Sequence, residues 1–306
     1  MTDIRNETMS PSGRGAYQSL SFRRQIILLM LVAGLCAAFV GDIAIGPASY
    51  GLGEVMRTLV APADADAQMR VIVWSIRLPS ALMAIVVGMA LAIGGAQMQT
   101  ILNNPLASPF TLGISSGASF GAALALAFGV ALVPMAGDYI VAANAFMMAM
   151  ATAFLIHLVS LRRGASVQTI VLLGIALVFS FNTALAITQY FAAEQAVAAI
   201  VFWTMGSLTK ATWPKLAITA LAVGVTLPIF LHRRWQLTAL RLGEARAASF
   251  GIPVRRLRLE TLILVSLLSA IPVALSAPSA SSAWSDRISP ACWSAKTSAS
   301  CCPQAR

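Results

Sequence analysis

The sequence predicts an all-α membrane protein, a polytopic bundle of helices, because it is strongly apolar, poor in charge and divided into long apolar runs. Hydrophobic residues make up 58% of its 306 residues and charged residues 10%, and the mean hydropathy is +0.80. Ordinary soluble domains carry about 25% charged residues, so a water-soluble fold is excluded. The net charge of +10 comes mainly from basic residues in short connectors. It therefore indicates membrane topology, and we expect contact with a lipid bilayer and not with nucleic acid.

Seven apolar runs have about the 18 residues or more that a membrane helix needs. They cover residues 25–45, 79–101, 114–134, 139–161, 167–190, 213–231 and 259–275. The basic connectors fall on one side of the membrane if the N-terminus is cytoplasmic, as the positive-inside rule requires. Residues 1–22 are polar and lack the apolar core of a signal peptide. We therefore expect a disordered cytoplasmic leader at 1–22, a membrane domain at 23–275 and an aberrant tail at 276–306.

Charged residues are almost absent from the predicted spans. The sequence holds no Asp, Glu, Lys or Arg from Pro79 to Gly137, and His157 is the one basic side chain from residue 140 to 161. Carriers driven by protons or sodium usually need such groups inside the membrane, so this pattern argues against one. We interpret His157 as interfacial and not as part of a proton relay. Because no paired carboxylates, nucleophile elbow or metal-spaced cluster occurs, we expect no catalytic residue, no metal site and no enzyme activity.

Small residues recur at helical spacing at the start of the third predicted span. Gly117 and Gly121 stand one turn apart, in the stretch GASFG. Small residues at this spacing let helix backbones approach closely in a membrane. We favour packing inside one bundle over a specific dimer contact.

The segment NNPLASPFTLGISSGA, residues 103–118, interrupts the apolar pattern with two prolines. The residue before a proline avoids the helical region, so the second helix is expected to end at Asn104. Irregular backbone at membrane depth survives only where protein or a water-filled cavity covers it. Two interpretations stay open for this segment: the wall of a translocation path, or a tight cytoplasmic turn.

Two long motifs resemble one transporter family. The first is RLPSALMAIVVGMALAIGGAQMQTILNNPLASPFTLGISSGASFGAALAL, residues 77–126, and the second is ALRLGEARAASFGIPVRRLRL, residues 239–259. Both are similar to stretches of the membrane permeases of ABC importers (type II importers) that carry iron–siderophore complexes, haem and vitamin B12. The resemblance runs in order from about residue 25 to residue 275.

The resemblance implies a permease subunit with about ten membrane helices of about 20 residues each when intact. Its partners would be ABC ATPase subunits, a periplasmic or lipoprotein substrate-binding protein, and a second permease subunit in a homodimer or heterodimer. ATP would be used by the ATPases, and no cofactor would be bound by this chain. The location implied is the bacterial inner membrane. A non-ABC secondary carrier or a membrane scaffold is the alternative function.

The same resemblance assigns roles to named residues. The ATPase-coupling loop would comprise Leu242, Gly243, Glu244, Ala245 and Arg246. The resemblance, together with the small and uncharged side chains, predicts a translocation path formed by Gln97, Asn103, Asn104, Pro105, Leu106, Pro109, Gly113, Ser116 and Gly117. Arg57 is the candidate for docking the binding protein, with a plain interfacial anchor as the other interpretation.

The tail SAPSASSAWSDRISPACWSAKTSASCCPQAR, residues 276–306, breaks with the apolar pattern. A soluble tail, a cysteine site and a shifted reading frame are the three explanations. No histidine accompanies Cys292, Cys301 and Cys302, and their spacing matches no zinc pattern.

Codon structure favours the shifted frame. Codons for Trp, Cys and most Ser begin with T, and T in the middle of a codon specifies Phe, Leu, Ile, Met or Val. With suitable codons, one added G turns residues 277–290 into GTIGFVGLVGPHIAR, which resembles the segment that follows in the family. We therefore expect a single-base deletion near codon 276. A natural truncation and a sequencing error both fit.

Overall fold

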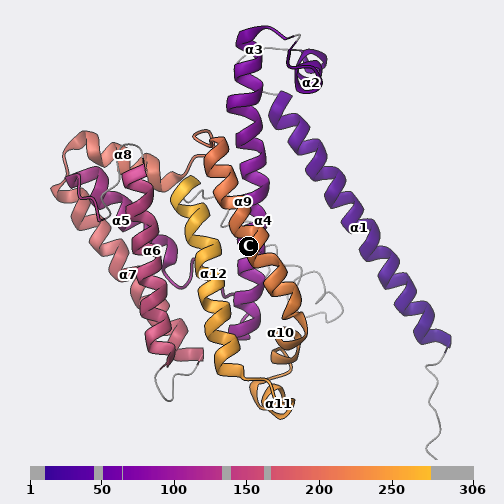
Figure 1. The fold of residues 1–306 in the computed structure, drawn as a ribbon. Coiled ribbons are helices and arrows are strands. Elements are labelled where there is room, and N and C mark those ends of the chain that lie inside the picture. Colours follow the sequence, from indigo (N-terminus) through magenta and orange to yellow (C-terminus); the bar gives the residue numbers. More distant parts are fainter. Residues whose placement is uncertain (1–10, 45–50, 64, 133–138, 162–166, 277–306) are drawn as a thin grey trace, which may run out of the picture. The chain divides into compact units, whose positions relative to one another are not determined.

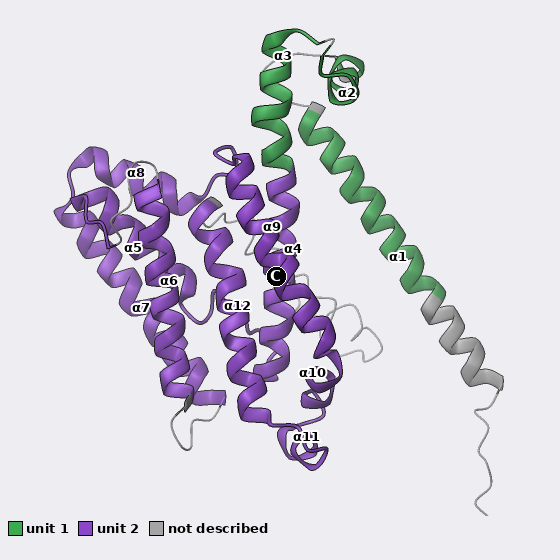
Figure 2. Ribbon diagram, in the orientation of Figure 1, with its two compact units in different colours: residues 1–81 green, residues 82–306 purple. Residues whose placement is uncertain are grey.

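The computed structural model describes residues 11–44, 51–63, 65–132, 139–161 and 167–276, so all of the expected tail except Ser276 lies outside the described residues. Within those ranges every regular element is a helix, which confirms the all-α membrane fold. The chain divides into two compact units, residues 1–81 and 82–306 (Figure 2).

Six helices in the described residues are long and apolar enough to cross a membrane. They correspond to six of the seven predicted spans. The remaining span, expected over residues 114–134, is the 15-residue helix α5, Ile114–Phe128. It is short because Gly113 and Gly129, both left-handed with φ of 79° and 64°, bound it at its two ends. The apolar helix α8, Glu194–Met205, was not predicted, because its 12 residues are too few for a spanning run.

Unit 1 contains α1 (Pro11–Ala44), α2 (Leu52–Val60), α3 (Ala67–Val71), the π-helix η1 (Ile72–Arg77) and the first turn of α4 (Leu78–Leu102). Its core is Ile43, Val55, Met69, Val73 and Ala81.

Two helices differ from the sequence analysis in their bounds. Residues 11–22 were expected in a disordered leader, but α1 already begins at Pro11, and proline is well suited to a first helical position. The second span was expected over residues 79–101, but the helix runs from Ala67 to Leu102. Its 36 residues make it about 54 Å long, whereas the hydrocarbon core is about 30 Å thick. The polar and charged residues of the first turns extend the helix beyond the apolar window that defined the prediction.

Unit 2 contains the rest of α4 and the helices from α5 to α12. In chain order these are α5, α6 (Ile140–Leu161), α7 (Val167–Phe191), α8, α9 (Trp213–His232), α10 (Arg234–Leu240), α11 (Glu244–Ser249) and α12 (Val254–Ser276).

Helix α12 is the central helix of unit 2 (Figure 1). It contacts α5, α6 and α9, and 67% of its most apolar window is buried, against 11% for α7. Apolar side chains such as Phe179 and Leu172, 69% and 66% exposed, cover the outer face of α7. In a membrane helix such a face meets lipid or another subunit.

Candidate functional site

The irregular segment 103–113 folds back into the bundle of unit 2. A Cβ placed on Gly94, two turns before the end of α4, would meet Pro109 Cγ at 3.7 Å. Two turns into α7, a Cβ on Gly174 would lie 2.9 Å from Leu112 Cα. Both contacts lie well inside their helices, so the segment is a re-entrant stretch. This packing argues against a tight turn outside the bundle, and the wall of a translocation path stays a prediction.

Side chains of the segment satisfy several of its own backbone groups, which a re-entrant stretch in a membrane requires. Asn104 Oδ1 accepts a hydrogen bond from Leu106 N at 2.9 Å. Ser108 N donates to Thr111 Oγ1 at 3.1 Å, and Thr111 N donates back to Ser108 Oγ at 3.3 Å. These Asn, Ser and Thr side chains take the place of helical hydrogen bonds, which explains why a polar, proline-containing stretch folds here.

Helix α5 starts from this segment and packs against α6 through its glycines. A Cβ on Gly117 would meet Thr152 Oγ1 at 2.3 Å, and one on Gly121 would meet the carbonyl oxygen of Asn144 at 2.4 Å. The second contact is with backbone, which cannot move aside as a side chain can. Close packing of this bundle, the favoured interpretation of the sequence, is therefore the role of this glycine pair.

The predicted path residues fall into an exposed set and a packed set. Asn103, Pro105 and Leu106 are exposed, Leu106 by 82%. Pro109, Gly113 and Gly117 are buried in helix contacts, and Asn104 and Ser116 are partly buried. Gln97 on α4 is also partly buried, and its Oε1 has no hydrogen-bond partner among the described residues. The structure thus exposes Asn103, Pro105 and Leu106 and packs the other set into helix contacts, and their part in a translocation path stays a prediction.

The predicted coupling loop lies at one end of unit 2, in the connector between α9 and α12 (Figure 1). Leu242, Glu244, Ala245 and Arg246 are exposed, and Gly243 has φ 106° and ψ 151°, a conformation that side chains disfavour.

Apolar residues fix the inner side of this connector. Leu237 and Leu240 of α10 and Ala247 of α11 are at most 5% exposed, and they share a core with Leu257 of α12. The connector is therefore a structured surface and not a loose loop.

Two ion pairs join the connector to α12, and a third lies within α12. Glu244 of α11 pairs with Arg258 of α12. Glu260 of α12 pairs with Arg233, which follows α9, and accepts a hydrogen bond from Arg256 Nε at 2.8 Å. The sequence analysis did not identify these pairs. The spacing of Arg256 and Glu260 on one helix was a visible signal, whereas Glu244 and Arg258 are too far apart in sequence to indicate contact.

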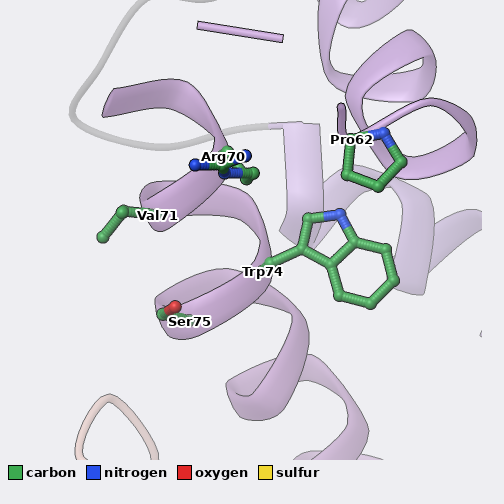
Figure 3. A pocket seen from close by; sticks show the side chains of 5 residues that line it. All are labelled: Pro62, Arg70, Val71, Trp74 and Ser75. Atoms are coloured by element: carbon green, nitrogen blue, oxygen red, sulfur yellow. The ribbon is translucent and has the colours of Figure 1, made fainter. Parts of the chain in front are cut away.

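Arg57, the predicted docking residue, lies exposed on α2 in unit 1. The next residue, Thr58, accepts a hydrogen bond on its carbonyl oxygen from Trp74 Nε1 at 3.2 Å. Trp74 lines an open hollow of about 380 Å³, in which Pro62 faces the indole and Arg70 lies one helical turn away, with Val71 and Ser75 completing the lining (Figure 3). Arg70 is a second exposed cation that the sequence analysis did not single out.

Comparisons with known proteins give the family. Residues 27–278 match the model of the FecCD transport family. The haemin transport system permease protein HmuU of Yersinia pestis is 33% identical over 80% of this chain and 74% of its own length. The molybdate import system permease protein MolB of Haemophilus influenzae is 31% identical over 82% and 74%. Relatives at 31% and 30% identity are the ferric enterobactin permease FepG of Escherichia coli and the vitamin B12 permease BtuC of Pectobacterium atrosepticum.

A solved structure agrees with these relatives. It is described as an inward-facing conformation of a metal-chelate type ABC transporter. It superposes with a TM-score of 0.69 at 28% identity, over 83% of this chain and 77% of its own. The chain therefore belongs to the FecCD transport family, as the multi-pass permease of an ABC importer.

Proposed function

We propose that this chain, paired with a second permease subunit, moves a ferric–siderophore complex across the bacterial inner membrane, with haem and cobalamin as close alternatives. The relatives carry haem, a ferric siderophore, vitamin B12 and molybdate. Most of these are bulky metal complexes, which favours a wide and weakly binding path. The exposed residues Asn103, Pro105 and Leu106 would contribute to this path, because their uncharged side chains would bind a ligand only weakly.

The observation that carries the proposal is the structured connector of α10 and α11. It presents residues 242–246 outward while burying Leu237, Leu240 and Ala247. A structured surface of this kind can receive a force from a partner subunit that binds to it. In the proposed cycle, partner ATPases close on ATP, the connector moves, and the helices expose the path alternately to the two faces of the membrane. The chain itself carries out no covalent chemistry and binds no cofactor.

In this proposal, a substrate-binding protein delivers the ligand by docking on the membrane face opposite the connector. Arg57 is the proposed contact, because exposed guanidinium groups form oriented pairs with carboxylates. With the connector on the cytoplasmic side, the N-terminus is cytoplasmic too. This orientation agrees with the arginines at residues 233–258, since basic connectors face the cytoplasm.

Uptake by proteoliposomes tests the proposal. The chain, its ATPase and its binding protein are reconstituted, and labelled ferric enterobactin, haemin, cyanocobalamin and molybdate are supplied in turn. We expect uptake of one iron complex that requires ATP and is unaffected by an ionophore. Uptake that the ionophore abolishes and ATP depletion does not affect would establish a secondary carrier instead. No uptake of any probe, with the ATPase fully retained, would contradict the proposed ligand class.

A further inference from the structure

A buried arginine joins the coupling connector to the central helix. Arg258 lies in the second turn of α12 and is 8% exposed. Its Nη2 donates to Oε1 of Glu244, the first residue of α11. Its Nε is buried without a hydrogen-bond partner among the described residues. Loss of the partner of a buried charge is strongly destabilising, because water does not take the partner's place. The burial of the Arg258 charge therefore depends on Glu244.

The two ends of this pair differ in environment. The side chain of Glu244 is 58% exposed, whereas that of Arg258 is 10% exposed. Pairs in which both groups are exposed contribute little, because water screens them. Here the arginine is fixed by its burial and the glutamate is the movable partner. The pair therefore joins the start of α11 to α12, beside the apolar contact of Ala247 with the core that contains Leu257.

We propose that Arg258 is a positioning residue, which holds α11 to α12 through Glu244 so that a displacement of the coupling connector is passed directly to the central helix. The proposal deepens the proposed function and rests on it for the source of the displacement.

The contacts around this ion pair support a role in transmitting motion as well as a role in local stability. Helix α12 contacts α5, α6 and α9, so a movement of α12 reaches most of unit 2. The second ion-pair group, Arg233 with Glu260, joins the end of α9 to the same end of α12. Gly243, which precedes α11, has φ 106° and ψ 151° and no atom within 4 Å of its Cβ position. The Glu244–Arg258 pair joins the residue that follows it to α12.

Distance measurement by electron paramagnetic resonance tests this role. Spin labels are placed at the exposed positions Ala248 of α11 and Ile263 of α12, after the four native cysteines have been changed to serine. The full chain is reconstituted with its ATPase and measured without nucleotide and with ATP and vanadate. The variants are Arg258→Gln, Arg258→Lys and Glu244→Gln. Arg255→Gln is the matched control, because it removes one positive charge near the start of α12 and keeps the Glu244 and Glu260 pairs.

We expect one narrow distance distribution, equal in both nucleotide states, for the unaltered chain and for Arg255→Gln. Arg258→Gln and Glu244→Gln should broaden it, and Arg258→Lys should restore it. The same two variants should lower kcat for ATP hydrolysis by about three- to thirtyfold, the usual range for coupling residues, and leave KM for ATP unchanged. A distribution that does not broaden in either variant would overturn the proposal, whatever happens to thermal stability.

The outcomes separate this inference from the proposed function. If Arg258→Gln does not fold, Glu244→Gln decides the question, because it alters an exposed group. If the unaltered chain retains no ATPase, the proposed function fails, and the spin-label distances of the permease alone still show whether Arg258 fixes α11. The proposed function and this inference are both supported if Arg258→Gln retains the full amount of ATPase and shows a broadened distance distribution.

Discussion

The α5–α6 contact and the connector of α10 and α11 are held by different forces. Between α5 and α6, glycine lets two backbones meet, and the nearest atom to a Cβ on Gly121 is a carbonyl oxygen at 2.4 Å. In the connector, ion pairs such as Glu244 with Arg258 join the elements, and a Cβ on Gly243 would meet nothing within 4 Å. A side chain has no room at Gly121 in the first contact, whereas it has room at Gly243 in the second. A transporter needs both kinds of region: a rigid contact, such as that between α5 and α6, and a part that receives motion, such as the connector.

The largest effect is expected from filling the rigid contact. Gly121→Leu places a side chain against Asn144 O and Met148 Cγ, which lie 2.4 and 2.8 Å from the Cβ position. Overpacking against backbone is expected to lower the free energy of unfolding by about 3 kcal/mol or more. Thermal unfolding of the purified protein in detergent measures it.

The control is Gly224→Ala on α9, where a Cβ would meet nothing within 4 Å. It should leave stability unchanged or raise it, by up to about 1 kcal/mol, because alanine favours helix over glycine. Equal stability of Gly121→Leu and the unaltered chain would show that the α5–α6 contact is not rigid.

A smaller loss is expected at the end of the same contact. Asn144 is fully buried, accepts a hydrogen bond from Leu132 N at 2.9 Å and donates one to Val130 O at 2.6 Å. Asn144→Ala leaves these two backbone groups without that partner, which should cost about 2 kcal/mol. The same unfolding assay measures this loss. Ser180→Ala, which removes an exposed hydroxyl from α7, should change stability by less than about 0.5 kcal/mol.

The connector should tolerate substitution better than the α5–α6 contact does. Gly243→Ala meets no atom, so only the backbone conformation at φ 106° opposes it, at a cost of about 1 kcal/mol. We expect the folded chain to persist and ATPase retention on the purified permease to fall. An unfolding loss as large as that of Gly121→Leu would contradict the contrast between the two regions.

The smallest effect is expected at Asn103. Its φ of 44° is one that asparagine and glycine accept, so Asn103→Gly should alter the free energy of unfolding by less than about 0.5 kcal/mol. Asn104→Gly, one residue further, removes the acceptor of Leu106 N and should cost about 1 kcal/mol. The difference between these two variants in the unfolding assay shows whether side-chain hydrogen bonds hold the re-entrant segment.

Most spans followed from the sequence because lipid imposes length and hydropathy on each helix separately. The third span was overestimated at its C-terminal end, since Gly129 adopts a left-handed conformation and ends α5 after Phe128. The re-entrant segment before it depends on where Gly94 and Gly174 lie after folding. Hydropathy does not report such contacts. Residues 242–246 were predicted from a family motif to form the coupling loop; the structure shows four of them exposed, and their role stays a prediction. Arg258 was missed because its pairing with Glu244 arises only when α11 folds onto α12.

Retention of an ABC ATPase by the purified permease tests the central claim most directly, that motion enters through the connector. The unaltered chain and a variant with alanine or serine at Leu242, Glu244 and Arg246 are purified from cells that express the ATPase at equal levels. We predict equimolar ATPase on the unaltered chain and little on the variant, with both permeases folded. Equal retention by the two chains, or none by the unaltered chain, would contradict the account.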